Sequence, residues 1–408
     1  MVELKIELNK GVGYGSAPRS WNLLREDVSL PCAVLYEDRL RHNLAWMREF
    51  IGEYGLKLAP HGKTTMAPKL FAMQLAGCAW GITLATAHQS AVAQAHGVRR
   101  VIMANQLVGR GNLAIVSRLL EDPGFNFYCL VDSSANAEQL GRFFRQRGQR
   151  LRVLLELGVT GGRTGVRDEA QMDAVLSAIG QHEEALELCG IEMYEGVLED
   201  EASIRAFLQR AVAVTRKLLA ENRFGSSPAI LSGAGSSWYD VVAEEFSAAK
   251  LGDAVEVVLR PGCYLTHDVG AYRAAQIRIS ASNPVARRMH SELLPALQVW
   301  AYVQSRPEPE RAIIAMGKRD VAFDSGLPVP SFHFRPGGSR PGAAAEHWTV
   351  TKLMDQHAYM QVAAQDDIRV GDMIGFDIAH PCLTFDKWRK VLMVNSDYDV
   401  VDTVETFF

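Results

Sequence analysis

Residues 126–157 read NFYCLVDSSANAEQLGRFFRQRGQRLRVLLEL: an apolar run, a longer segment of helical period, and a second apolar run. Apolar runs of this length joined by a helix are typical of neighbouring parallel strands, which are buried on both faces. The same alternation continues on both sides, from about residue 31 to about residue 265. The sequence therefore predicts repeated βα units and an α/β fold.

The number of apolar runs distinguishes between the α/β architectures. Amphipathic segments such as 38–54 and 204–222 accompany them. Eight strands with helices between them over this length predict a (β/α)8 barrel, the TIM barrel architecture. The predicted strands are LKLAP (56–60), GITLA (81–85), VIMA (101–104), NFYCLV (126–131), LRVLLEL (151–157), LELCGIEMY (186–194), AILS (229–232) and AVEVVLR (254–260).

The pattern changes after about Tyr272. Strand-like runs alternate there with Pro- and Gly-rich loops such as RPGGSRPGAAAEHW. We therefore expect a barrel over 31–270 and a mostly antiparallel β domain made of 1–30 and 271–408. The strand-like runs are QIRIS (276–280), LLPALQVWAYVQS (293–305) and RAIIAMG (311–317).

Composition and charge exclude several classes of function. The 408 residues are 48% hydrophobic and carry a net charge of -4 with both signs interleaved. This distribution offers no basic stripe for nucleic acid and no polybasic flank for lipid, so neither partner is expected. The start MVELKIELNK lacks the apolar core of a signal peptide, and six scattered cysteines do not form a disulfide framework. We expect a cytoplasmic protein without a membrane span.

A histidine and a lysine directly follow the first predicted strand, in PHGKTTMAP (60–68). The active site of such a barrel lies at the C-terminal ends of its strands, which places His61 and Lys63 at the rim. A partly desolvated lysine has a lowered pKa and can form a Schiff base with a carbonyl cofactor. From position alone a solvated surface lysine is the alternative, so the other strand ends must decide.

Further strand ends are rich in glycine and hydroxyl groups. The fifth strand ends in ELGVTGGRTGV, where the glycines on both sides of Arg163 let the backbone approach a ligand closely and the guanidinium is expected to point into the barrel mouth. The seventh ends in SGAGSSWYD before a helix, an arrangement that holds phosphate through backbone N–H groups and hydroxyls. This loop also has the usual phosphate position of the fold. The candidate residues are Arg163, Tyr194, Ser232, Gly233, Gly235, Ser236, Ser237 and Tyr264.

A histidine and a cysteine flank one proline in DIAHPCLTFDKWR (377–389). This spacing lets the imidazole of His380 and the thiolate of Cys382 bind one metal ion and leaves positions for water and substrate. A soft thiolate favours zinc over magnesium or calcium, with manganese as an alternative. A histidine in a turn beside a buried cysteine is the competing interpretation. His357, in MDQHAYM, is a candidate neighbour whose expected role is structural.

The ordered set PHGKT, GGRTGV, SGAGSS, RPGCY and HPC resembles the D-serine dehydratase and D-threonine aldolase family, over nearly the whole chain. These are pyridoxal-phosphate enzymes of the alanine-racemase-like fold type. The resemblance implies that Lys63 binds pyridoxal phosphate covalently, that Arg163 faces the pyridine nitrogen, and that His380 and Cys382 bind the metal. Gly233, Gly235, Ser236 and Ser237 correspond to the phosphate loop, and His61, Tyr194, Ser232 and Tyr264 complete the expected cofactor site.

The sequence also departs from the family pattern. It reads PHGKTTM where PHGKTHK is commoner, and DQH (355–357) where relatives often have two acidic residues before the histidine. The second departure concerns the surroundings of the metal. The H-x-C pair resembles the dehydratase branch, whereas the aldolases usually have H-x-D. This residue is the main ground for choosing between the two reactions.

The resemblance implies a zinc-assisted dehydratase of D-3-hydroxy amino acids, with D-serine or D-threonine as leading substrates. A metal-dependent D-threonine aldolase, which releases glycine and an aldehyde, is the alternative. An amino-acid racemase and a non-catalytic pyridoxal-phosphate carrier are weaker alternatives, because neither needs a metal. A homodimer is expected, since in this fold type the second domain commonly closes a neighbour's site.

Overall fold

The eight predicted apolar runs form one parallel eight-stranded sheet, which confirms the predicted fold class. The computed structural model describes residues 9–13 and 20–408. The order β2-β9-β8-β7-β6-β5-β4-β3 places each strand beside its neighbour in the sequence, except where β9 returns to β2. The strands are β2 (Lys57–Leu58), β3 (Ile82–Leu84), β4 (Arg100–Gln106), β5 (Asn126–Val131), β6 (Leu151–Leu157), β7 (Leu186–Met193), β8 (Ala229–Gly233) and β9 (Val255–Leu259).

The two ends of this strand order meet just beyond β2. An isolated parallel bridge joins His61 to Thr83 in β3. The Thr83 N–H donates to the Pro60 carbonyl at 2.8 Å, and its hydroxyl donates to the Ala59 carbonyl at 2.7 Å. These contacts close the sheet into a barrel. Small and branched side chains from its strands fill the interior, namely Ala59, Ile102, Ala104, Leu130, Leu154, Cys189, Ile230 and Val258.

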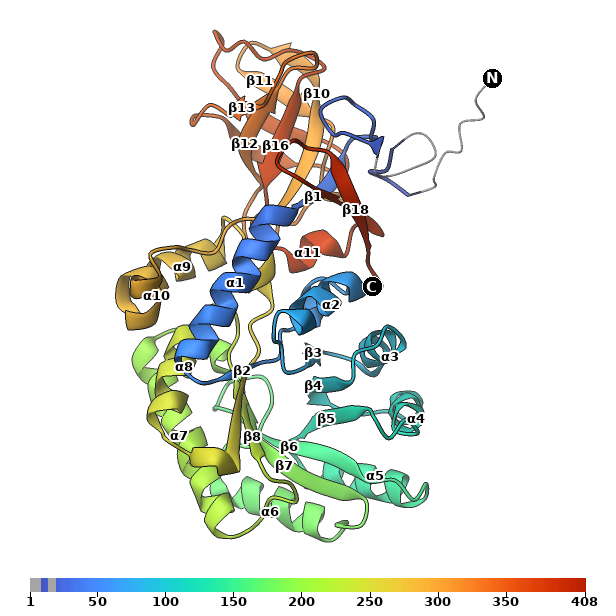
Figure 1. Cartoon of the computed structure of the whole chain (residues 1–408), viewed down its shortest axis with the longest axis vertical. Coiled ribbons are helices and arrows are strands. Elements are labelled where there is room, and N and C mark those ends of the chain that lie inside the picture. Colours follow the sequence, from blue (N-terminus) through green and yellow to red (C-terminus); the bar gives the residue numbers. More distant parts are fainter. Residues whose placement is uncertain (1–8, 14–19) are drawn as a thin grey trace.

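Helices pack around the outside of the barrel (Figure 1). Several begin at a short polar side chain that accepts the backbone N–H three residues on, as Thr86, Ser133, Asp168 and Asp200 do. Such caps satisfy N–H groups that have no partner inside the helix. The helices are α2 (Pro68–Ala76), α3 (Ala87–Ala95), α4 (Arg110–Leu119), α5 (Ser134–Arg145), α6 (Glu169–Gly180), α7 (Glu201–Ala220) and α8 (Tyr239–Ala248).

A second sheet follows the order β13-β12-β16-β10-β1-β17-β18, and β11, β15 and β14 extend it from β10. All its ladders are antiparallel except that between β1 and β17. Its strands are β1 (Cys32–Tyr36), β10 (Leu297–Glu308), β11 (Arg311–Ile314), β12 (Val329–Phe334), β13 (Gly342–Ala343), β14 (Thr349–Leu353), β15 (Ala358–Gln361), β16 (Met373–Asp377), β17 (Lys390–Val394) and β18 (Val400–Glu405).

Two segments differ from the sequence-based expectation. Residues 32–36, within the range predicted for the barrel, form β1 between β10 and β17 of the second sheet. QIRIS, predicted as a strand, lies in α9 (Ala271–Ser282), which α10 (Pro284–Met289) follows. Ile279 is buried and Ile277 is exposed. A run of five residues is too short for its period to separate a strand from a helix.

Helix α1 (Glu37–Glu53) connects the two sheets (Figure 1). Its polar side chains hold the segment before β10: Asn43 Nδ2 donates to the Leu294 carbonyl at 2.8 Å, and Trp46 Nε1 donates to the Ser291 carbonyl at 2.9 Å. A short helix, α11 (Cys382–Phe385), lies between the second sheet and α2. The junction therefore brings the HPC segment toward the barrel.

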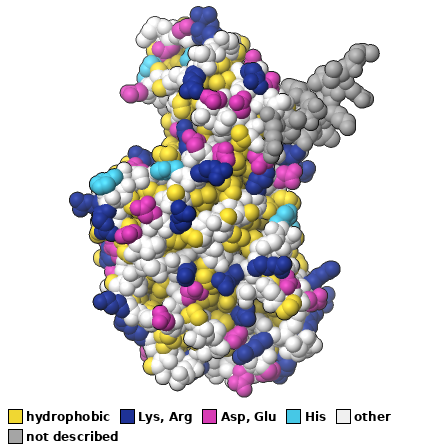
Figure 2. Space-filling model, viewed as in Figure 1, with side chains coloured by type: hydrophobic (Ala, Val, Ile, Leu, Met, Phe, Trp, Pro, Cys, Tyr) yellow, Lys and Arg dark blue, Asp and Glu magenta, His cyan; other side chains and the backbone are white. Residues whose placement is uncertain are grey.

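Basic and acidic side chains are interspersed over the face drawn in Figure 2. This distribution agrees with the small net charge of -4. Among the described residues, no helix combines the length and the apolar character needed to cross a bilayer.

The packing of α1 on the barrel gives a test of the junction. Phe50 is fully buried, stacks on Trp46 at 5.3 Å between ring centroids, and meets the edge of Tyr239 at 5.2 Å. Phe50→Ala should lower the free energy of unfolding by about 3–5 kcal/mol, because it leaves a cavity there. Denaturant titration measures this loss. The neighbouring exposed substitution Glu49→Ala should change it by less than about 0.5 kcal/mol, and an equal effect of both variants would contradict this packing.

Candidate active site

One pocket opens at the C-terminal ends of the barrel strands and is closed on one side by α11 of the same chain. It encloses about 640 Å³, part of it open to solvent. The structure brings seven predicted site residues together in its lining: His61, Lys63, Arg163, Tyr194, Gly235, Ser236 and Cys382. The sequence did not single out the other eight lining residues, five of which have polar or ionisable side chains: Thr64, Asn105, Arg260, Cys263 and Tyr272.

Lys63 lies in a 3-10 turn, Gly62–Thr64, directly after the bridge that closes the barrel. Its side chain reaches solvent through the pocket, yet the surrounding walls desolvate its ammonium group. This burial lowers the pKa of Lys63, although the Cys382 sulfur acts in the opposite direction. A lowered pKa makes the neutral, nucleophilic amine more accessible at neutral pH.

His61 stands beside Lys63 and is neutral. Burial, together with the charges of Lys63 and Arg260, holds the pKa of His61 well below its usual range. Its buried Nδ1 has no hydrogen-bond partner in the protein. A flat neutral ring with a free nitrogen at a barrel mouth can pack against or hydrogen-bond an aromatic ligand.

Arg163 lies in the loop after β6, and its guanidinium is 5.1 Å from the centre of the Tyr194 ring. Two hydrogen bonds to neighbouring strand ends hold the loop. The Gly165 N–H donates to Asp132 Oδ2 at 3.0 Å, and the Thr164 hydroxyl donates to Glu156. The pocket therefore places a cation and an aromatic ring together, opposite the end of β2.

A buried ion pair between Arg260 and Glu192 forms part of the pocket's floor. Arg260 Nη2 donates to Glu192 Oε1 and to the Met193 carbonyl, and both charged side chains are at most 4% exposed. Burial raises the pKa of Glu192, and the Arg260 charge opposes this shift. The sequence contains one signal for this pair, an arginine at the end of the apolar run AVEVVLR. The pairing itself could not be predicted, because the partner of this arginine lies on a different strand.

The SGAGSS loop reaches the pocket with its middle residues. Ala234, with φ of +81°, turns the chain so that Gly235 and Ser236 line the pocket. Glu195 Oε1 accepts the Gly235 N–H at 2.6 Å, and Ser236 Oγ accepts the N–H groups of Gly262 and Cys263. A side chain at Gly235 would meet Tyr194 at 2.9 Å, so only glycine allows this approach.

Four predicted cofactor residues do not line the pocket. The Ser232 hydroxyl donates to the Val258 carbonyl at 2.9 Å, and the Gly233 carbonyl accepts from the Arg260 N–H at 3.1 Å. The Tyr264 hydroxyl accepts from Gln74 Nε2 at 3.3 Å in the buried core. The Ser237 carbonyl accepts from Arg278. The side chains of Ser232 and Tyr264 are thus engaged outside the pocket, and Gly233 and Ser237 contribute backbone carbonyls to the loop.

Cys382 enters the pocket from the β domain. Its thiol has one sulfur neighbour and one oxygen neighbour on the barrel. Its Sγ lies 3.8 Å from Cys263 Sγ and 3.5 Å from Thr64 Oγ1. Hydrogen bonding, first from Cys263 and then from His380, holds the pKa of the Cys382 thiol well below its usual range, against the effect of burial. The same contact with Cys382 raises the pKa of His380 to about 9. The two side chains are thus coupled: each favours the charged form of the other.

This pair has the donor chemistry of a zinc site. His380 Nδ1 contacts Asp324 Oδ2 at 2.7 Å, which leaves Nε2 for a metal, and a carboxylate partner of this kind orients metal-binding histidines. Among the described residues, no group of three or more His, Cys, Asp and Glu could hold an ion, so His380 and Cys382 stand without a third protein ligand. His357 is exposed in the turn between β14 and β15, where only its backbone bonds to Met354.

The pocket also fits a flat, phosphorylated pyridine cofactor. Four buried polar atoms around it lack any protein partner: His61 Nδ1, Glu192 Oε2, Glu195 Oε2 and Arg260 Nε. Buried polar atoms in proteins are almost always hydrogen-bonded, so this concentration indicates a polar ligand. A lysine of lowered pKa, an aromatic wall and a glycine-serine loop are present at the same mouth.

Two family models match the chain. The alanine racemase N-terminal domain matches residues 36–255, and a serine dehydratase domain matches residues 296–394. A D-threonine aldolase of Arthrobacter sp. is 27% identical over 344 residues, which cover 82% of this chain and 80% of that protein. A D-threo-3-hydroxyaspartate dehydratase of Delftia sp. strain HT23 is 27% identical over 247 residues, covering 59% of this chain and 62% of that protein.

Solved structures share the fold of the whole chain. A D-threonine aldolase from Filomicrobium marinum superposes with a TM-score of 0.75 at 22% identity, over 93% of this chain and 95% of that one. A cysteine-to-alanine variant of D-threo-3-hydroxyaspartate dehydratase, solved in a metal-free form, superposes with a TM-score of 0.72 at 23% identity, over 95% and 99%.

The thiolate character of Cys382 is testable in protein treated with EDTA. An ordinary thiol gains about tenfold in alkylation rate per pH unit below its pKa, whereas a thiol of low pKa is already ionised. The alkylation of Cys382 by iodoacetamide should therefore change by less than about twofold between pH 6 and 8. Mass spectrometry of the modified peptide measures the rate, with glutathione in the same tube as a reference. Parallel pH profiles for Cys382 and glutathione would contradict the assignment.

Proposed function

The chain belongs to the alanine racemase-like family, whose N-terminal domain model spans residues 36–255, and we propose that it is a pyridoxal-phosphate- and zinc-dependent dehydratase of D-3-hydroxy amino acids. The relatives it matches are lyases by name, an aldolase and a dehydratase. One observation carries the proposal: Lys63 and Cys382 line the same pocket. A cofactor-binding amine and a metal-binding thiolate can therefore act on one substrate molecule.

The barrel side of the pocket holds the cofactor in this proposal. Lys63 binds pyridoxal phosphate covalently, and Gly235 and Ser236 bind its phosphate. When bound, the cofactor stabilises negative charge at the substrate's α-carbon. Arg163 would be the residue that faces the pyridine nitrogen, where its positive charge would disfavour protonation. The Lys63 amine would be the group placed to take the substrate's α-proton, and its lowered pKa suits this role.

The β-domain side of the pocket holds the metal. Cys382 and His380 bind zinc, and Asp324 orients the imidazole through Nδ1. When bound, zinc acts as a Lewis acid on the substrate's β-hydroxyl and makes it a better leaving group. Loss of the α-proton and of the hydroxyl gives an enamine that hydrolyses to a 2-oxo acid and ammonia. D-serine and D-threonine are the proposed substrates.

Retro-aldol cleavage at the same site is the second candidate. A D-threonine aldolase is among the relatives, and the match covers 82% of this chain. That reaction needs the proton of the β-hydroxyl to be removed and the bond between the α- and β-carbons to break, giving glycine and an aldehyde. The H-x-C pair favours dehydration, because the resemblance associates H-x-D with the aldolases.

A homodimer remains part of the proposal, and the structure limits what a partner needs to supply. Cys382 of the chain's own β domain lines its own pocket. In this proposal the same chain therefore supplies both Lys63 and Cys382.

The cofactor assignment predicts which lysine is labelled. Protein purified with pyridoxal phosphate should be yellow, and borohydride reduction followed by peptide mapping should mark Lys63. Lys63→Ala should remove the colour and the label, because no amine remains at that place in the pocket. Lys69→Ala is the matched control, since Lys69 is an exposed lysine nearby that pairs with Asp402. A label on another lysine would show that the site is misplaced.

The metal assignment predicts separate effects on activity and colour. EDTA should abolish dehydration of D-serine and leave the yellow colour intact, and zinc should restore activity. Cys382→Asp should lose zinc-dependent dehydration and show, at most, weak glycine formation, because a carboxylate favours harder ions. Cys78→Ser, at an exposed cysteine, is the control that should behave as the wild type. Full activity after complete removal of metal would falsify the Lewis-acid role.

A further inference from the structure

Helix α9 connects the two sides of the active site. Asp268 Oδ1 accepts the N–H groups of Gly270 at 2.9 Å and Tyr272 at 3.2 Å and so fixes the start of the helix. The Val269 N–H donates to the Ile378 carbonyl at 3.1 Å, two residues before His380. Tyr272, in the first turn of α9, lines the pocket. The helix is therefore anchored at the HPC segment and runs from there along the barrel.

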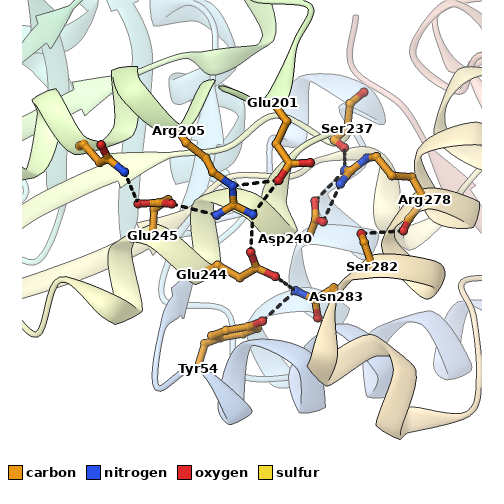
Figure 3. A network of polar contacts seen from close by, with 11 residues as sticks. Tyr54, Glu201, Arg205, Ser237, Asp240, Glu244, Glu245, Arg278, Ser282 and Asn283 are labelled. Atoms are coloured by element: carbon orange, nitrogen blue, oxygen red, sulfur yellow. Dashed lines mark hydrogen bonds and ion pairs between the residues drawn. The ribbon is translucent and has the colours of Figure 1, made fainter. Parts of the chain in front are cut away.

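Arg278, further along α9, contacts the loop that carries Gly235 and Ser236 (Figure 3). Its Nη2 donates to the Ser237 carbonyl at 2.7 Å. The guanidinium also bonds both carboxylate oxygens of Asp240, at 2.8 and 2.7 Å. Its carbon atom lies 4.0 Å from the centre of the Trp238 ring. One planar group thus contacts three residues of the loop and of the first turn of α8.

These contacts constrain a backbone that otherwise has few supports. On its other side the loop is held by the bond from the Gly235 N–H to Glu195 and by the bonds that Ser236 Oγ accepts. Asp240 is only 1% exposed, so its charge requires a partner. A planar fork that bonds a carboxylate and a carbonyl at once fixes their relative position, which a flexible ammonium cannot do.

We propose that Arg278 is a positioning residue for the phosphate of the cofactor. By holding the Ser237 carbonyl and the start of α8, it sets the direction of the backbone N–H groups that the phosphate meets. The anion-binding strength of a glycine-rich loop at a helix N-terminus depends on that direction. This inference rests on the proposed function, because it requires pyridoxal phosphate in this pocket.

The same polar network contains a matched reference arginine. Arg205 donates to Glu244 at 2.7 Å and to Glu245 at 2.8 Å, one turn further along α8 (Figure 3). Its exposed fraction of 31% is close to the 26% of Arg278, and it also holds a helix through carboxylates. It makes no bond to residues 233–238. Arg278→Lys and Arg205→Lys are therefore the same chemical change. Only the first removes a contact to the loop.

The experiment compares pyridoxal phosphate with pyridoxal, which lacks the phosphate and keeps the aldehyde and the ring. Dissociation constants of both are measured by absorbance titration for cofactor-stripped wild type, Arg278→Lys and Arg205→Lys. In Arg278→Lys the constant for pyridoxal phosphate should rise about tenfold or more, and that for pyridoxal should change by less than about twofold. In Arg205→Lys both constants should stay within about twofold of the wild type.

The ratio of the two constants identifies the role. An unchanged ratio in Arg278→Lys, or an equal rise of both constants, overturns the inference, because a general loss of structure weakens both ligands alike. The inference is also overturned if Arg205→Lys loses the preference for pyridoxal phosphate over pyridoxal as much as Arg278→Lys does. If Arg278→Lys does not fold, Arg278→Met with Asp240→Asn removes the unpaired carboxylate and must show the same selective loss. Wild type that binds neither ligand contradicts the proposed function itself.

Discussion

The closure of the barrel between β2 and β3 is the constraint on which the rest of the site depends. β2 has two residues, and the ring closes through the His61–Thr83 bridge, the bonds that Thr83 makes to Pro60 and Ala59, and the bond from the Trp80 N–H to the Leu58 carbonyl. Lys63 follows within one turn, so its backbone is fixed at the rim where the closed barrel desolvates its ammonium. Burial at this rim lowers the pKa of Lys63.

The β domain supplies another part of the pocket's lining. α11 brings the Cys382 thiolate to the Cys263 and Thr64 side of the barrel mouth, and α9 links the HPC segment to the phosphate loop. A histidine of lowered pKa, two arginines, a lysine and a cysteine of lowered pKa line one pocket. Such a pocket suits an anionic cofactor on one side and a soft metal on the other.

The fold was largely predictable, because each barrel strand is a continuous apolar run and eight such runs leave few architectures. The misassigned QIRIS segment shows a limit of prediction from hydrophobic periodicity. Five residues are too few to distinguish the period of a strand from that of a helix, and in the structure this segment is a helix with Ile279 packed against the core. The residues of β1 were included in the range predicted for the barrel, because the sequence of an apolar run does not indicate which sheet the strand joins. Its partners β10 and β17 lie far along the chain.

The site was predictable where a residue's place at a strand end determines its surroundings, as for Lys63 and Gly235. It was not predictable where the direction of a side chain decides, since Ser232 and Tyr264 point behind the wall. Nor could the pairing of Arg260 with Glu192, 68 residues apart, be inferred from one strand alone. Contacts across strands depend on register, which single runs do not specify.

The reaction itself gives the most direct test of this account. Holoprotein with zinc is incubated separately with D-serine, D-threonine and their L-enantiomers, and the products are identified and quantified. The account predicts one 2-oxo acid and one ammonia for each D-substrate consumed, with no glycine and no reaction of the L-enantiomers. Glycine and an aldehyde in amounts equal to the substrate consumed would contradict it and establish cleavage of the carbon–carbon bond at this site instead.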